Sequence, residues 1–180
     1  MKLIILDRDG VINEDSDAYI KSVDEWLPIA GSIEAIAQLT HAGFTVAIAT
    51  NQSGIGRGYY DIATLNAMHA KMHALLKPFG GKVDYIAYCP HLSEDHCDCR
   101  KPKAGLLTEI GAYFKADLTQ AIVVGDSLRD WQAAHAVGAQ YAQVLTGKGL
   151  KTLADPRLPN SIPVFDDLAH VVQNLLAEKQ

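Results

Sequence analysis

The sequence predicts an α/β fold, a three-layer sandwich in which helices cover both faces of a mostly parallel, Rossmann-like sheet. Short apolar runs without polar interruptions recur along the chain, as expected of strands that are buried on both faces. Stretches with helical periodicity separate these runs. The length of 180 residues and the 48 % hydrophobic content suit one core, so residues 1–180 are predicted to form a single domain.

The expected elements alternate along the chain. The first five predicted strands are Leu3 to Leu6, Phe44 to Ala49, Val83 to Tyr88, Ala121 to Val124 and Tyr141 to Leu145. The helical patterns between them lie near Ser32 to His41, Asp61 to Leu76, Ala104 to Phe114 and Ser127 to Ala136. An irregular stretch with several Pro and Gly residues follows from Gly147 to Pro163. A last strand is predicted at Ile162 to Phe165, and a last helix at Asp166 to Ala177.

One segment departs from this alternation. Residues 10–28 directly follow the first strand and are too polar and irregular for a core helix. We therefore predict that they form a flap over the end of that strand. No insertion after the first strand, or between the second and the third, is long enough for a separate cap domain, so a small substrate is expected to reach the site directly.

The charge balance argues against several classes of partner. Sixteen Lys and Arg residues against 21 Asp and Glu residues give a net charge of −5, which offers no basic surface to nucleic acid or to an anionic membrane. The N-terminal apolar run is too short for a signal peptide or a membrane span. We expect a cytoplasmic monomer that binds a small molecule.

Polar side chains follow the predicted strands, and open α/β sheets bind ligands at that edge. Asp7 and Asp9 follow the first strand, and alternation along a strand would point both to one side and Arg8 away. Asp126 follows the fourth strand and completes an oxygen-rich set that suits Mg²⁺ together with a substrate phosphate. The residue types predict a phosphatase in which one aspartate attacks phosphorus and the other moves the proton.

Taken in chain order, these motifs resemble the haloacid dehalogenase superfamily of phosphatases, and the resemblance covers nearly the whole chain. It implies that Asp7 is the nucleophile and a Mg²⁺ ligand, and that Asp9 is the acid/base and offers its backbone carbonyl to the metal. It also implies that Asp126 is a further ligand. Thr50, after the second strand, and Lys101, after the third, would stabilise the phosphoryl group.

Two neighbouring residues compete for parts of these roles. Lys103 lies close to Lys101, but the surrounding Cys-Arg-Lys-Pro sequence favours Lys101. Asp130 follows Asp126 by four residues, and we expect it to support the site rather than to bind the metal.

All three cysteines of the chain lie in one short segment beside a histidine. Cys89, His91, Cys97 and Cys99 match the ligand set of a closed, tetrahedral structural Zn²⁺ site. His96 is the alternative imidazole, but it adjoins Cys97, and neighbouring side chains rarely converge on one metal. We expect Zn²⁺ to order a loop over residues 89–101 and to take no part in the chemistry.

The zinc motif narrows the resemblance to one subgroup of the superfamily. Cys-Pro-His followed by Cys-Asp-Cys-Arg-Lys-Pro is similar to a subgroup that contains heptose bisphosphate phosphatases and histidinol phosphatases. The stretch Thr-Asn-Gln-Ser-Gly-Ile-Gly-Arg-Gly-Tyr at residues 50–59 resembles the heptose enzymes, whereas the short gap between His91 and Cys97 resembles the histidinol enzymes. We give the longer motif more weight.

The resemblance then implies hydrolysis of the 7-phosphate of a heptose 1,7-bisphosphate through an aspartyl-phosphate. This reaction would serve the synthesis of nucleotide-activated heptose for lipopolysaccharide core or related glycans. Histidinol phosphate is the alternative substrate. A non-enzymatic, zinc-stabilised phosphate-binding or interaction module is the lower alternative.

Several polar residues near the predicted site are candidate substrate contacts: Asp15, Tyr19, Asn51, Gln52, Ser53, Arg57, Arg100 and Ser127. A sugar bisphosphate carries a second anionic group, which would give the arginines a charged partner. Ser127 stands where some relatives have a lysine.

A second group of histidines is not interpreted as a metal site. His69 and His73 have the four-residue spacing of a helical metal pair, but no third ligand is evident. We expect both on a solvated helix face.

Overall fold

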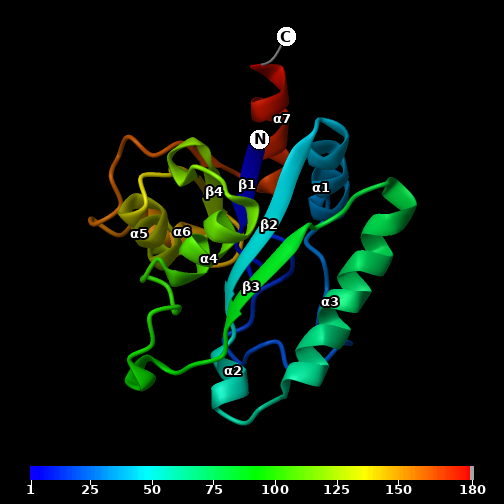
Figure 1. Cartoon of the computed structure of the whole chain (residues 1–180), viewed down its shortest axis with the longest axis vertical. Helices are drawn as coiled ribbons and strands as arrows, with labels where there is room; N and C mark the ends of the chain where they lie inside the picture. The colour runs from blue at the N-terminus through cyan, green and yellow to red at the C-terminus, as the bar shows by residue number, and fades with distance from the viewer. Residues whose placement is uncertain (179–180) are drawn as a thin grey trace.

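The computed structural model describes residues 1–178 and contains a six-stranded sheet between two layers of helices (Figure 1). The strands lie in the order β3-β2-β1-β4-β5-β6, and all neighbours are parallel. They span β1 (Lys2–Leu6), β2 (Phe44–Asn51), β3 (Tyr85–Cys89), β4 (Ile122–Gly125), β5 (Gln140–Val144) and β6 (Val164–Phe165). The predicted α/β class and parallel sheet are confirmed.

The helices follow the predicted alternation. They are α1 (Ser32–His41), α2 (Ser53–Gly56), α3 (Ile62–Leu76), α4 (Gly105–Phe114), α5 (Leu128–Ala136), α6 (Gly149–Leu153) and α7 (Leu168–Ala177). Short 3₁₀ turns lie at Lys77–Phe79, Ser93–Asp95 and Leu118–Gln120. Among the described residues, none of these helices has the length and apolar character needed to span a membrane.

Local hydrogen bonds explain where the observed boundaries differ from the predicted ones. Helices α3 and α7 begin after the expected residues because Asp61 and Asp167 act as N-caps, accepting hydrogen bonds from backbone amides in the first turn. Strand β3 begins at Tyr85 rather than Val83, because the Asp84 side chain accepts the hydrogen bond of the Val46 amide at 2.9 Å. Helix α6 forms inside the stretch predicted to be irregular.

Strand residues alternate between two hydrophobic cores, one on each face of the sheet. Ile4 and Leu6 point into a core that includes residues of α1, α3 and α7. Leu3 and Ile5 point into the opposite core, with residues of α4 and α5. Figure 1 shows α1 and α3 to one side of the sheet and α4 and α5 to the other. Burial on both faces is the reason that these strands appear as unbroken apolar runs.

The predicted flap is irregular but anchored. Trp26 is fully buried, and Val11 and Ile12 join the same core as α1 and α3. The Ser32 hydroxyl donates to the carbonyl of Ile12 at 2.7 Å and ties the flap to the start of α1. The flap is therefore held at its base, while Asp15 and Tyr19 reach a cavity beside the sheet.

Candidate active site

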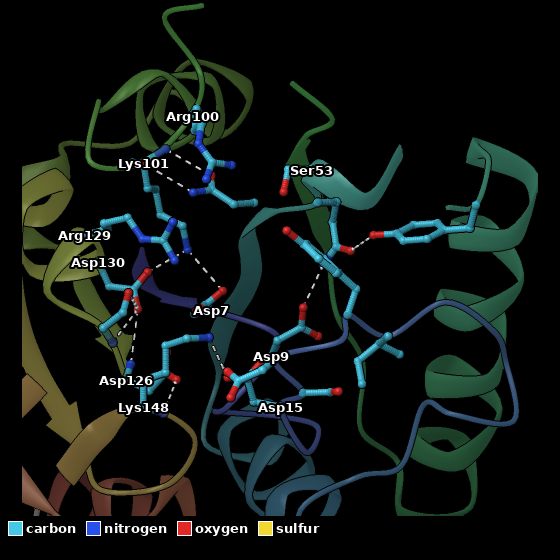
Figure 2. A pocket seen from close by; sticks show the side chains of 18 residues that line it. Asp7, Asp9, Asp15, Ser53, Arg100, Lys101, Asp126, Arg129, Asp130 and Lys148 are labelled. Carbon is cyan, nitrogen blue, oxygen red and sulfur yellow. Dashed lines mark hydrogen bonds and ion pairs between the residues drawn. The ribbon is translucent and has the colours of Figure 1, made fainter. Parts of the chain in front are cut away.

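A cavity of about 270 Å³ lies at the carboxyl ends of the central strands, between the flap and the loop after β3. Figure 2 shows the side chains that converge on it. The predicted site residues that line it are Asp7, Asp9, Asp15, Tyr19, Asn51, Gln52, Ser53, Arg100, Lys101, Asp126 and Ser127. The structure therefore brings together residues from five separate parts of the sequence.

Lys101 is a buried cation beside Asp7. Its Nζ lies 3.1 Å from Oδ1 of Asp7 and 2.6 Å from Oδ1 of Asp130, and it donates to the Ala49 carbonyl at 2.7 Å. Burial alone would lower the pKa of Lys101, but the Asp130 and Asp7 carboxylates raise it above its usual value. Lys103 instead is about half exposed and donates to the carbonyl of Cys97, outside the cavity.

Three carboxylates crowd this end of the sheet. One oxygen atom from each of Asp7, Asp126 and Asp130 lies within 4.8 Å of the others. Burial and the neighbouring carboxylates raise the pKa of Asp7 to about 7 and that of Asp126 to about 9. A cation would relieve this repulsion, and an all-oxygen donor set fits a hard ion such as Mg²⁺.

Asp130 is engaged differently from the other two carboxylates. Its Oδ1 pairs with Lys101, while Oδ2 accepts from the backbone amides of Asp126 and Ser127 and from the Ser127 hydroxyl at 3.0 to 3.2 Å. Both oxygens already have partners. Asp130 therefore holds the lysine and the turn between β4 and α5, which leaves Asp7 and Asp126 as the freer oxygen donors.

Two glycines make room for the Asp126 carboxylate. A Cβ atom on Gly10 would come within 2.1 Å of Oδ2 of Asp126, and one on Gly147 within 2.3 Å. Both glycines also have positive φ, which other residues rarely adopt. The amide of Lys148 donates to the same oxygen at 2.8 Å, so Asp126 sits in a closely fitted backbone cradle.

As predicted, Asp7 and Asp9 both line the cavity and Arg8 does not, but Arg8 also pairs with Asp9, which the alternation did not predict. Oδ1 of Asp9 accepts from Nε and Nη2 of Arg8 at 3.0 and 2.7 Å, and from Nδ2 of Asn13 at 2.7 Å. Arg8 can pair with Asp9 because β1 ends at Leu6 and the chain then turns, with the amides of three later residues directed at the Arg8 carbonyl. Burial alone would raise the pKa of Asp9, but the Arg8 guanidinium and these hydrogen bonds hold it below its usual value.

Two positively charged side chains line the cavity that were not predicted from the sequence. Arg129 lies in the first turn of α5, and Lys148 lies in the loop between β5 and α6. Nζ of Lys148 pairs with Oδ2 of Asp15 at 2.7 Å and so joins the flap to this loop. The position of Lys148 just after the fifth strand is the signal that could have found it, since ligands bind at that edge of the sheet.

Thr50 and Arg57 are not brought to the cavity wall. Thr50 is buried, and its Oγ1 accepts from Nε2 of Gln52 at 2.9 Å. The guanidinium of Arg57 lies over the Tyr19 ring, 5.6 Å from its centre. The predicted contacts of both residues with a phosphate stay predictions.

The cysteine cluster forms in the loop after β3. Sγ of Cys89 lies 3.6 Å from Sγ of Cys97 and 2.9 Å from Sγ of Cys99, and Nδ1 of His91 lies 3.3 Å from Sγ of Cys99. Sulfur atoms bound to one tetrahedral zinc at about 2.3 Å would be about 3.8 Å apart. All four ligand atoms lie within 4.8 Å of one another, a group that does not include His96.

One thiol of this cluster, that of Cys97, is predisposed to bind a metal, whereas burial raises the pKa of Cys89 and of Cys99. Burial alone would raise the pKa of Cys97, but hydrogen bonds from the Arg100 amide and from neighbouring groups lower it to about 6. A thiolate is the form that binds zinc. The donor set therefore suits Zn²⁺, and its four ligand atoms lie close enough together to share one ion, although the two sulfurs 2.9 Å apart would have to separate to bind it.

Comparisons with known proteins agree with this geometry. A family model described as HAD-hydrolase-like matches residues 98–171. The chain is 59 % identical over 174 residues to a D-glycero-β-D-manno-heptose-1,7-bisphosphate 7-phosphatase of Pseudomonas aeruginosa, covering 97 % of each chain. It is 54 % identical over 180 residues to one from Neisseria meningitidis, covering 99 % of this chain and 96 % of the relative.

Solved structures of two heptose bisphosphate phosphatases are also similar to this chain. A D,D-heptose 1,7-bisphosphate phosphatase from Bordetella bronchiseptica, in complex with magnesium and phosphate, superposes with a TM-score of 0.96 at 54 % identity over 99 % of each chain. The corresponding enzyme from Burkholderia thailandensis has a TM-score of 0.78 at 46 % identity, over 98 % of this chain and 99 % of its own.

Proposed function

The chain belongs to the D-glycero-β-D-manno-heptose-1,7-bisphosphate 7-phosphatase family, and from this premise we propose that it removes the 7-phosphate of such a bisphosphate. The predicted membership of the haloacid dehalogenase superfamily is confirmed. The observation that carries the proposal is the position of Asp7, which lines the cavity 3.1 Å from the buried ammonium of Lys101.

Asp7 would act as the nucleophile. A bond forms between a carboxylate oxygen of Asp7 and phosphorus while the bond between phosphorus and the sugar oxygen breaks, and the sugar oxygen takes a proton from Asp9. A water molecule then attacks phosphorus and gives its proton to Asp9. Inorganic phosphate leaves and Asp7 is regenerated. Lys101, whose ammonium lies 3.1 Å from Asp7, would offset negative charge on the phosphoryl oxygens throughout.

The surroundings of Asp9 leave one carboxylate oxygen available for proton transfer, and its lowered pKa suits the step in which it takes a proton from water. Three donors hold Oδ1, whereas within residues 1–178 Oδ2 accepts only from Nε2 of Gln52 at 3.1 Å. The side chain keeps 24 % of its surface exposed and lines the cavity. One oxygen is thus fixed while the other is available to a leaving group.

Mg²⁺ is the metal that we propose for this site. The related Bordetella structure contains magnesium with phosphate. In this chain the carboxylates of Asp7 and Asp126 and the backbone carbonyl of Asp9 would hold the ion. Bound there, Mg²⁺ supplies positive charge next to the transferring phosphoryl group.

The second phosphate of the substrate would meet basic side chains at the cavity wall. Arg100, from the cysteine loop, and Arg129, from α5, both line the cavity, and neither forms an ion pair with another residue of the described chain 1–178 (Figure 2). Phosphate recognition by arginine is strong and geometrically specific. We assign the 1-phosphate to this side, away from Asp7.

We further propose that Zn²⁺ binds Cys89, His91, Cys97 and Cys99 and orders the loop that carries Arg100 and Lys101. The cytoplasmic location, the monomeric state and the single-domain organisation of residues 1–180 stay predictions. So do the contacts of Asp15, Tyr19, Asn51, Gln52, Ser53 and Ser127 with the substrate.

The proposed substrate is tested by comparing kcat/KM for D-glycero-β-D-manno-heptose 1,7-bisphosphate and histidinol phosphate, with Mg²⁺ and with EDTA. We expect the bisphosphate to be preferred, the activity to require Mg²⁺, and ³¹P NMR to show that the product keeps its 1-phosphate. Faster turnover of histidinol phosphate, or loss of the 1-phosphate, would overturn the assignment.

Arg100→Ala should selectively impair the bisphosphate. Loss of one charge-assisted contact costs about 1.5 to 3 kcal/mol, so kcat/KM should fall by about one to two orders of magnitude. The loss on p-nitrophenyl phosphate, which has no second phosphate, should be much smaller. Lys103→Ala removes a nearby cation outside the cavity and is the matched control. Equal losses on both substrates would mean that Arg100 serves the transferring group or the loop instead.

A further inference from the structure

The Arg8 side chain lies between the active site and helix α3 and is completely buried. A buried guanidinium is costly unless its charge and its N–H groups have partners. Two of these groups, Nε and Nη2, meet Oδ1 of Asp9. The third nitrogen, Nη1, points the other way, toward α3, where it meets His69 at 3.3 Å and the sulfur of Met68 at 3.7 Å.

His69 is therefore not on a solvated helix face, and that prediction is wrong for this residue. It is 7 % exposed, whereas His73, one turn later, is exposed. Burial and the nearby Arg8 charge lower the pKa of His69 to about 3, so the ring is neutral at physiological pH. Because a guanidinium can only donate, Nε2 of His69 must accept the hydrogen bond and the ring proton must sit on Nδ1.

The contacts form a continuous chain from α3 to the cavity. His69 holds one end of the Arg8 guanidinium, and the other end holds one oxygen of Asp9. A guanidinium is planar and rigid, so fixing Nη1 also fixes the direction of Nε and Nη2. His69 thus influences where the second oxygen of Asp9 points, without lining the active-site cavity itself.

We propose that His69 is a positioning residue for proton transfer: through Arg8 it aims the Asp9 carboxyl group at the leaving oxygen of the substrate. The inference rests on the proposed acid/base role of Asp9 but does not depend on which phosphate ester is the natural substrate. A misplacement of about 1 Å in a catalytic group can cost about 100-fold in rate. Loss of the acceptor on His69 should have an effect approaching that size.

The test uses kcat/KM for a series of aryl phosphates whose leaving groups span poor to good, because a good leaving group needs no proton from Asp9. His69→Leu, which removes the acceptor, should lower kcat/KM by about 10- to 100-fold for the poorest leaving group and less than about 3-fold for 2,4-dinitrophenyl phosphate. Asp9→Asn should show the same dependence more steeply. His69→Gln, whose amide oxygen can replace Nε2 as the acceptor, should restore most of the loss.

His73→Leu is the matched control, since it removes the other histidine of the pair from the same helix. It should leave the dependence on leaving group unchanged. If circular dichroism shows that His69→Leu is unfolded, His69→Asn replaces it as the test variant. Asn keeps a polar side chain but is too short to reach Arg8, so this variant should show the same selective loss that is expected of the leucine variant.

Two outcomes would overturn the inference: equal losses across the series in a folded His69 variant that lacks the acceptor, or no loss at all. Failure of the heptose bisphosphate as a substrate would remove the proposed function but leave this series interpretable. The two failures are therefore distinguishable.

Discussion

Asp7→Asn is expected to abolish turnover while the protein remains folded. An amide cannot form the acyl-phosphate, and enzymes that lose their nucleophile typically lose about 10⁴-fold or more in kcat. The fold should tolerate the change because Asn has nearly the same shape and relieves repulsion among the carboxylates that raise the pKa of Asp7. Lys101 keeps its ion pair with Asp130 at 2.6 Å.

Steady-state rates of phosphate release give the first measurement. The second is mass spectrometry of acid-quenched enzyme, which should show a phosphate adduct on the peptide that contains Asp7 in the wild type and none in the variant. Asp117→Asn is the control, because Asp117 lies outside the cavity, where its side chain accepts from the Thr119 amide at the start of a 3₁₀ turn, and it should keep both turnover and the adduct on Asp7. An Asp7→Asn variant with wild-type kcat would refute covalent catalysis by this residue.

Loss of zinc is expected to have the largest effect on stability. Protein purified without chelators should contain one Zn²⁺ per chain, and His91→Ala should release it. Structural zinc sites in peptides contribute about 10 to 16 kcal/mol, so a loss of about 3 kcal/mol is a modest expectation for this loop, which also packs on the rest of the chain. In a chain of this size that loss corresponds to a fall in Tm of about 6 to 12 °C.

The same variant should lose phosphatase activity, because the loop carries Lys101 and Arg100 into the cavity. His96→Ala is the matched control in the same loop, since His96 lies outside the ligand group, and it should keep both zinc and Tm. Elemental analysis that finds no zinc in the wild type would refute the site. Zinc retained by His91→Ala and lost by His96→Ala would reverse the assignment of the imidazole ligand.

Much of the fold could be predicted because its cause is local. Strands buried on both faces must be apolar at every position, so runs such as Leu3 to Leu6 stand out without any knowledge of their neighbours. Boundaries were less accurate, since they depend on single hydrogen bonds such as that between Asp84 and the Val46 amide, 38 residues apart in sequence.

Much of the candidate site could also be predicted, because its residues follow the ends of strands that the sequence reveals. Parallel strands end at one edge, so Asp7 and Asp126 could be placed together from their positions after two apolar runs. The cysteine cluster was evident because its ligands lie within one short loop. Lys148 obeys the same rule for the fifth strand, but a lone lysine in a loop carries no motif that marks it as part of a site.

The sequence by itself determined the layers of the sheet, the carboxylates at its edge and the residues of the two proposed metal sites, because each depends on residue type at short spacing. Tertiary structure alone decided where Arg8 points and what His69 contacts. These residues are 61 positions apart, and they meet only because α3 and β1 pack into the same hydrophobic core. A buried charge takes its direction from the partners that packing places around it, and sequence spacing carries no record of them.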